Sequence, residues 1–354
     1  MEQLCDIFKM VPGIQSGDTG LGNPALVEDT LSTLFSLSEI CLPHVSCYQA
    51  VPVVGHLCLC QGDYRGVAVQ LCVRTTEHAV HVLEPEQLCT LYTQHVLPVI
   101  QELLLETPPL PTLALRIVLP LLSVIPELPL EEHGIVTALV ELMKDVDPEE
   151  GICLLMLETL GCFMTAPTVD FSWLYTLGLH EQLSLLVLKL GVSPNTGEGT
   201  VLAAIRCLSA LLNYVMSVVK KALQTQTKSA GEEILRSSQC VVNTCGVLLV
   251  WYHYTSAPSA LLSITQLYGG QYKDFLTPYN VDILVESLKD KDDSRVKTTL
   301  KILKRIVSTD PDLLKSMIAS TREQLNKAIL AVKSTSPTLV PLSEEVSKLL
   351  QKTV

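Results

Sequence analysis

The sequence predicts an all-α protein in which about seven degenerate helical repeats stack into an α-solenoid. Three observations support this prediction. First, the 354 residues are 48% hydrophobic and only 18% charged, so the chain can bury a large apolar core and is not a disordered tail. Second, short polar breaks recur at steps of about 40–50 residues, a period typical of stacked helical repeats. Third, the segments between the breaks carry apolar residues at helical spacing.

The polar breaks define the domain organisation. The last step between them is about twice the others, so we place a further, weaker loop at residues 224–231. The sequence therefore predicts N-terminal repeats in residues 1–223, a polar loop at 224–231, and C-terminal repeats in 232–354 that continue the same solenoid and end in a basic segment. The clear breaks lie near residues 17–20, 61–63, 106–109, 144–148, 193–197 and 289–293.

Two early segments are ambiguous when taken alone. Residues 67–73 have the composition of a strand, but they follow a Gly-Asp turn where a second helix is expected, so we predict a helix. Residues 110–130 are apolar and contain Arg116 and four prolines. A membrane span needs about 20 uninterrupted apolar residues, so this segment predicts a buried helix instead.

The later repeats have clearer helical patterns. Residues 138–145 and 151–160 form one pair of predicted helices, and residues 283–290 and 295–307 form another. Residues 200–223 continue the same pattern as one long helix. In the last predicted helix, the apolar stripe comprises Val296, Leu300, Leu303 and Val307. We expect the following side chains to be buried between repeats: Leu142, Leu155, Leu160, Ile205, Leu208, Leu212, Leu300 and Leu303.

Two of these segments resemble armadillo/HEAT repeats. They read LVELMKDVDPEEGICLLMLETL and LVESLKDKDDSRVKTTLKILKRI, each a helix, a Lys-Asp turn and a second helix. The resemblance implies a right-handed superhelix whose inner helices line a protein-binding groove. It leaves the choice between the armadillo and HEAT subtypes open.

The degenerate, cysteine-rich repeats also resemble the non-catalytic C-terminal portions of Fused and Unc-51-like kinases. This resemblance implies a regulatory region that acts in complex assembly, at the cytoskeleton or the cilium, rather than in catalysis. The chain contains none of the protein-kinase sequences Val-Ala-Ile-Lys, His-Arg-Asp or Asp-Phe-Gly.

Cysteine and histidine residues are concentrated in the first hundred residues, and a metal- or thiol-dependent enzyme is therefore a less favoured alternative. There is no paired C-x-x-C sequence, and the cysteines alternate with leucine and valine, a pattern typical of buried structural thiols. We therefore expect no catalytic residues, no metal and no cofactor. Free cysteines and the absence of a signal peptide predict a reducing, intracellular location in the cytoplasm. The concentrated residues are Cys41, His44, Cys47, His56, Cys58, Cys60, Cys72, His78, His81, Cys89 and His95.

Charge is distributed unevenly along the chain. The net charge is −12, which argues against a nucleic-acid partner, but residues 289–354 carry 13 Lys and Arg against 8 Asp and Glu. Four of these cations, Lys297, Lys301, Lys304 and Arg305, fall on one helix face opposite the apolar stripe. They form either a solvated face or a contact for an acidic protein. The sequence therefore predicts a non-enzymatic scaffold that binds a protein, without nucleic acid and without a membrane span.

Overall fold

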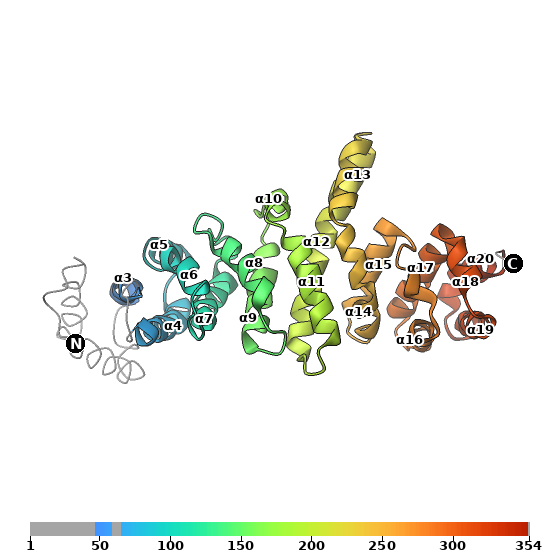
Figure 1. Cartoon of the computed structure of the whole chain (residues 1–354), viewed down its shortest axis with the longest axis horizontal. Helices are drawn as coiled ribbons and strands as arrows, with labels where there is room; N and C mark the ends of the chain where they lie inside the picture. The colour runs from blue at the N-terminus through green and yellow to red at the C-terminus, as the bar shows by residue number, and fades with distance from the viewer. Residues whose placement is uncertain (1–46, 59–64, 353–354) are drawn as a thin grey trace, which may run out of the picture. The chain divides into compact units, whose positions relative to one another are not determined.

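The structure is a computed structural model that describes residues 47–58 and 65–352. Every regular element in these ranges is a helix, and no strand occurs in them. The predicted all-α repeat fold is confirmed. The chain divides between Asp170 and Phe171 into two compact units, each with its own helices (Figure 1).

The first unit stacks its longer helices side by side. α4 packs against α7, and α7 packs against α9. α6 packs against α8 and forms a second row with it. Each helix buries one apolar face, and the stack joins these faces into one continuous core. The helices of this unit are α3 (Cys47–Leu57), α4 (Arg65–Val82), α5 (Pro85–His95), α6 (Leu97–Leu104), α7 (Leu110–Val124), α8 (Ile135–Asp145) and α9 (Gly151–Met164).

Both ambiguous segments of the first unit are helical. Residues 67–73 lie inside α4, as predicted. The apolar segment at 110–130 forms the buried helix α7, which contains Pro120 and ends at Val124 before the next proline. At the start of α4, Arg65 is nearly buried and forms ion pairs of 2.7 Å with Glu102 and 3.1 Å with Glu106.

The second unit repeats a three-element pattern four times. Each repeat has a short first element, a second helix, and a third helix that is the longest in three of the four repeats. This three-element order is typical of stacked helical repeats of about 40–47 residues. The first two repeats are α10 (Phe171–Thr176), α11 (Leu179–Val192) and α12 (Glu198–Gln224), and then α13 (Lys228–Ser237), η3 (Gln239–Thr244) with α14 (Cys245–Val250), and α15 (Ala257–Tyr268). The third repeat is η4 (Lys273–Leu276), α16 (Pro278–Leu288) and α17 (Asp293–Thr309). The fourth is α18 (Pro311–Ser316), α19 (Ala319–Thr335) and α20 (Val340–Lys352), with η5 (Pro337–Leu339) between α19 and α20.

The third helices of the second unit form one row. α12 packs on α15, α15 on α17, and α17 on α20, while α11, η3 with α14, α16 and α19 form the other row. We call the exposed side of α12, α15, α17 and α20 the third-helix face. With three helix groups in the first unit (α3–α4, α5–α7 and α8–α9), seven helix groups can be traced in the described residues, whereas the first predicted break, at residues 17–20, lies outside them.

The predicted polar loop is shorter than expected. Only residues 225–227 form the turn between α12 and α13, and residues 228–231 are already helical. The turn closes because Gln226 takes a positive φ of 58° and the Thr227 amide donates to the Ala222 carbonyl at 3.0 Å. Gly231 then packs on Ala222, so a polar segment becomes one arm of a helical hairpin that extends beyond the neighbouring helices (Figure 1).

Six of the eight predicted core side chains are buried, and two are not. Leu142 and Leu155 are only half-buried. In α8 and α9 the buried face is centred on residues such as Leu139 and Met156, which places Leu142 and Leu155 at its edge. The fully buried six are Leu160, Ile205, Leu208, Leu212, Leu300 and Leu303.

Candidate functional site: a basic face and a polar junction

The first candidate site is the exposed side of α17. Asp292 begins this helix by accepting a hydrogen bond at Oδ1 from the Ser294 amide, at 2.9 Å. The predicted apolar stripe, which includes Leu300 and Leu303, is buried against α15 and α20. The opposite side of the helix therefore faces solvent, within the third-helix face.

Three of the four predicted cations lie on that side. Lys297, Lys301 and Arg305 are exposed and follow one another at four-residue intervals. Lys304 differs, because it is half-buried and its Nζ lies 2.7 Å from Glu345 Oε1 of α20. The expectation that all four side chains face solvent is wrong for Lys304, because this side chain forms an ion pair with Glu345 of α20.

Neighbouring charges do not neutralise these three cations. α15 contains no charged residue, and α12 carries the cations Arg206, Lys220 and Lys221 against one carboxylate, Glu198, all exposed. The two carboxylates of α20 are already engaged, Glu345 with Lys304 and Glu344 with Lys333 at 3.5 Å. The third-helix face thus carries a positive charge on a chain whose net charge is negative.

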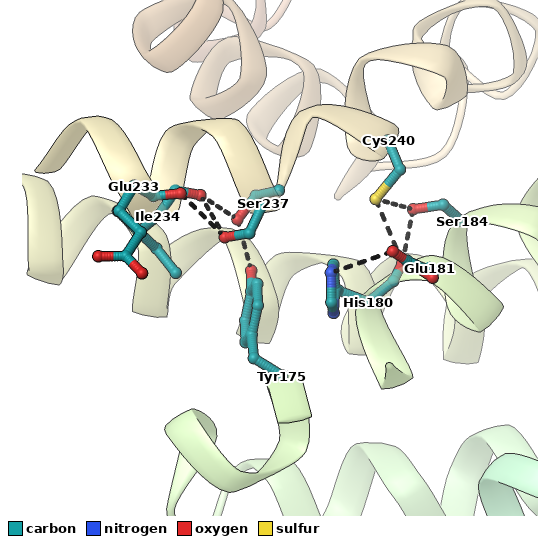
Figure 2. Close-up of polar contacts among 9 residues, drawn as sticks. Tyr175, His180, Glu181, Ser184, Glu233, Ile234, Ser237 and Cys240 are labelled. Atoms are coloured by element: carbon teal, nitrogen blue, oxygen red, sulfur yellow. Dashed lines mark hydrogen bonds and ion pairs between the residues drawn. The ribbon is translucent and has the colours of Figure 1, made fainter. Parts of the chain in front are cut away.

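The second candidate site is a polar junction between α10, α11, α13 and η3, shown in Figure 2. Ser238 Oγ donates to the Ile234 carbonyl at 2.7 Å and accepts from the Tyr175 hydroxyl at 2.9 Å. The Tyr268 hydroxyl donates to the Leu235 carbonyl at 3.1 Å. Two tyrosines from other helices therefore anchor the C-terminal end of α13.

A histidine and a cysteine complete this junction. The His180 ring stacks on Tyr175 at 4.2 Å between centroids, and its Nδ1 is buried without a hydrogen-bond partner in the described residues. Cys240 Sγ donates to the His180 carbonyl at 3.7 Å and lies 3.6 Å from Ser184 Oγ (Figure 2).

The chemistry of the junction is that of neutral groups. Burial lowers the pKa of His180, and burial raises the pKa of the Cys240 thiol. At neutral pH the imidazole is uncharged and the thiol keeps its proton. A thiolate is the form that attacks a substrate or binds a metal, so burial keeps Cys240 in its less reactive form.

An open pocket shares Cys240 with the junction. Its volume is about 570 Å³, and its walls come from η3, the segment before and at the start of η4, and the residue that caps α18. Sequence reasoning missed both the pocket and the junction, because their members come from separate repeats and form no local motif. The residues lining the pocket are Gln239, Cys240, Val242, Asn243, Gln271, Lys273 and Asp310.

The N-terminal cysteine and histidine concentration is only partly described by the structure. Cys41, His44 and Cys60 lie outside the described residues, as do the side chains of Cys47 and His56. Cys58 and Cys72 are buried in the helical core. Among the described residues, no group of three or more His, Cys, Asp or Glu side chains could hold a metal ion.

One helix in the described part of the chain, α12, is long and apolar enough to cross a membrane by length and composition. Half of that apolar stretch is buried inside the structure. Arg206 interrupts the apolar run of this helix, so the sequence did not predict a membrane span there.

Comparisons with known proteins bear on the whole chain. No protein-family model matches it. Serine/threonine-protein kinase ULK4 of Mus musculus is 26% identical over 337 residues, which cover 83% of this chain, and the match spans about 25% of the length of that relative.

Solved structures show a similar fold. A chain from a study of the phosphorylation switch that controls the interaction between cadherin and beta-catenin aligns with a TM-score of 0.63 at 12% identity, covering 94% of this chain and 57% of that one. An engineered protein aligns with a TM-score of 0.56 at 16% identity, covering 92% and 83%. With the three-element repeats of the second unit, these likenesses give the conclusion: the chain has an armadillo/HEAT-type helical-repeat fold.

Proposed function

We propose that the chain is a non-enzymatic protein-interaction scaffold that binds an acidic segment of a partner protein on its third-helix face. The observation that carries this proposal is the line of exposed cations on α17, Lys297, Lys301 and Arg305, none of which forms an ion pair with another described residue. Exposed charges of one sign contribute little to folding, and their main effect is to steer and select a partner of opposite charge.

The spacing of the three cations suits an extended peptide. Four residues of α-helix rise about 6 Å. Alternate residues of an extended chain are about 6.6 Å apart, so acidic side chains at every second position match the line. The uncharged surface of α15, with Ser259 and Gln266 exposed, offers hydrogen-bonding groups beside it.

A charge-reversal experiment tests this proposal. The Lys297→Glu/Lys301→Glu variant and the wild type are titrated with a labelled (Glu-Ser)₆ peptide at several salt concentrations. We expect the wild type to bind, with affinity that falls as salt rises, and the variant to lose binding by about tenfold or more. Lys304 is kept because its ion pair with Glu345 supports the fold.

The matched control is Lys228→Glu/Arg236→Glu on α13, which changes the net charge equally at two exposed positions away from α17. Loss of binding in both variants would assign the effect to net charge alone. Equal binding by the α17 variant and the wild type would reject the third-helix face as the site.

A second candidate function follows from the sequence match. The similarity to a kinase over about a quarter of its length supports a regulatory, non-catalytic repeat region of a Fused/Unc-51-like kinase or pseudokinase that acts in complex assembly. This role places the chain in the cytoplasm, at the cytoskeleton or the cilium. Imaging of the tagged chain in ciliated cells tests it, since even cytosolic distribution without enrichment at either structure would contradict this second role.

A further inference from the structure

The hairpin formed by α12 and α13 extends beyond the neighbouring helices (Figure 1). α13 packs on α12, and its C-terminal end meets η3, where Tyr175 and Tyr268 anchor it. The ten residues of α13 rise about 15 Å. We call residues 220–228, which contain the turn and the helix ends beside it, the hairpin tip. The tip therefore lies about 15 Å from the anchored end of the hairpin.

The hairpin tip is basic on a chain whose net charge is negative. Lys220, Lys221 and Lys228 are exposed, and none of them forms an ion pair with another described residue. The chain has no Asp or Glu between Glu198 and Glu232. The residues nearest the turn therefore present cations and no carboxylate.

An exposed leucine lies among these cations. Leu223 is 72% exposed, and no described residue covers it. Met216 and Val219 are half-buried and precede it by seven and four residues, so the three side chains share one side of α12. Transfer of such side chains from water to an apolar medium is favourable. The tip therefore combines positive charge with apolar surface.

The polar groups of the turn are bonded to one another. The Thr225 hydroxyl donates to the Lys221 carbonyl at 2.9 Å and lies 2.7 Å from the Thr227 hydroxyl. The Thr227 amide donates to the Ala222 carbonyl at 3.0 Å. Polar groups that already have partners lose little when water leaves them, so the turn can enter a less polar medium at low cost.

We propose that the hairpin tip docks on an anionic lipid membrane, with Leu223 in the interfacial region and the three lysines against the lipid phosphates. Basic segments are attracted to anionic lipid, and exposed apolar side chains strengthen the contact by entering the interface. The contact is peripheral, because the rest of α12 lies in the core of the second unit. This surface and its ligand are independent of the scaffold function proposed above.

The negative net charge of the chain does not prevent this contact. At physiological ionic strength, charges more than about 8 Å apart are largely screened from one another. Glu232 and Glu233 lie six and seven residues beyond Gln226 in the turn, which is about 9–10 Å along the hairpin. The other helices of the second unit stay behind the tip (Figure 1).

The directions of the lysines favour a flat surface over an acidic peptide. Lys220 and Lys221 are about 100° apart around α12, and Lys228 belongs to the other arm of the hairpin. Flexible cations that surround a tip can all reach a plane that the tip touches. A single extended peptide follows one side of the hairpin and meets only some of them.

Co-sedimentation of the full chain with lipid vesicles tests the proposal. We expect the wild type to bind vesicles with about 30% phosphatidylserine, but not phosphatidylcholine alone, and to dissociate as salt rises. Lys220→Gln/Lys221→Gln is expected to weaken binding about tenfold or more. Leu223→Gln is expected to weaken it several-fold, and both variants keep their melting temperature because these side chains are exposed. Failure of the wild type to bind anionic vesicles overturns the proposal.

The matched control is Lys291→Gln/Lys348→Gln, which removes the same charge at two exposed positions outside the hairpin. We expect this control to bind the vesicles as the wild type does. An equal loss in the control would assign the effect to net charge and overturn the proposal. Loss of vesicle binding in Lys297→Glu/Lys301→Glu, with full binding by the tip variants, would move the contact to the third-helix face and overturn it as well.

The depth of position 223 in the membrane gives a second readout. Leu223→Trp adds a fluorophore at the tip, and the wild type, which has two tryptophans, supplies the background emission. On phosphatidylserine vesicles the added emission is expected to shift to shorter wavelength and to be quenched by lipids brominated on their acyl chains. Gln266→Trp on α15 is the control and is expected to show neither change. Emission at position 223 that neither shifts nor is quenched would show that the tip does not enter the interface, and would overturn the proposal.

Discussion

The Tyr252 hydroxyl lies 2.9 Å from Thr299 Oγ1, and this pair joins the segment after α14 to α17 inside the core of the second unit. Ser287 Oγ of α16 lies 2.9 Å from the same Thr299 oxygen, and Thr299 donates its own proton to the Arg295 carbonyl at 3.0 Å. Three elements thus share one buried hydroxyl. The first unit contains a similar pair, in which the Tyr92 hydroxyl donates to Thr76 Oγ1 at 2.9 Å.

Removal of the shared acceptor is expected to cost more than removal of one donor. Thr299→Val keeps the shape but leaves the hydroxyls of Tyr252 and Ser287 buried with their common acceptor gone, at a cost of about 2–3 kcal/mol. Tyr252→Phe removes one hydrogen bond, and Thr299 Oγ1 keeps its contacts with Ser287 and the Arg295 carbonyl. The free energy of unfolding is therefore expected to fall by only about 1 kcal/mol. Urea unfolding of the two variants measures this difference, and equal losses would mean that Thr299 is not the centre of the network.

The packing of α17 gives a second prediction. Leu300 is fully buried, so Leu300→Ala is expected to reduce the free energy of unfolding by about 2–5 kcal/mol through lost burial and the cavity left behind. Leu155→Ala serves as the comparison, because Leu155 is half-buried and its truncation is expected to cost clearly less. Chemical denaturation measures both. Equal costs would show that the two leucines are packed alike.

The helices were predictable where the signal is local. In residues 284–306 the apolar stripe, the acidic turn and the cationic face all follow from spacing along one helix. The period of the polar breaks likewise predicted a stack of helical repeats, because each repeat must supply its own apolar faces.

The remaining features depend on residues that are far apart in the chain. Lys304 is held by Glu345, which lies on a later helix, so its half-burial has no signal in the residues around it. The same holds for the anchoring of α13, where Tyr175 and Tyr268 come from the preceding repeat and from the end of its own. The half-burial of Leu142 and Leu155 depends on where neighbouring helices lie across each stripe, which periodicity does not specify.

The anchoring of α13 gives a third prediction. Tyr175→Phe removes the hydrogen bond to Ser238 without changing the ring that stacks on His180. We expect the amides of α13 to exchange with deuterium about five- to tenfold faster, because a hydrogen bond of about 1 kcal/mol no longer holds its C-terminal end. Amides of α17, which has no contact with this hydroxyl, provide the internal control. Equal acceleration in both helices would indicate general destabilisation rather than release of α13.

The burial of His180 gives a fourth prediction, which concerns pH. Desolvation lowers the pKa of His180 in the folded state below the ordinary value of 6.5, and the Glu181 carboxylate opposes this shift only in part. Between the folded and unfolded pKa values the unfolded chain binds more protons, so the free energy of unfolding rises with pH across that window. The contribution of the neutral ring is therefore complete above about pH 6.5, is lost as the pH falls below that value, and levels off once the folded pKa is passed. Urea unfolding of the wild type and of His180→Phe, which keeps an aromatic ring beside Tyr175, between pH 7.5 and 5.0 measures this contribution. The wild type is expected to lose more stability than the variant on acidification, and parallel curves would show that His180 does not titrate in a buried site.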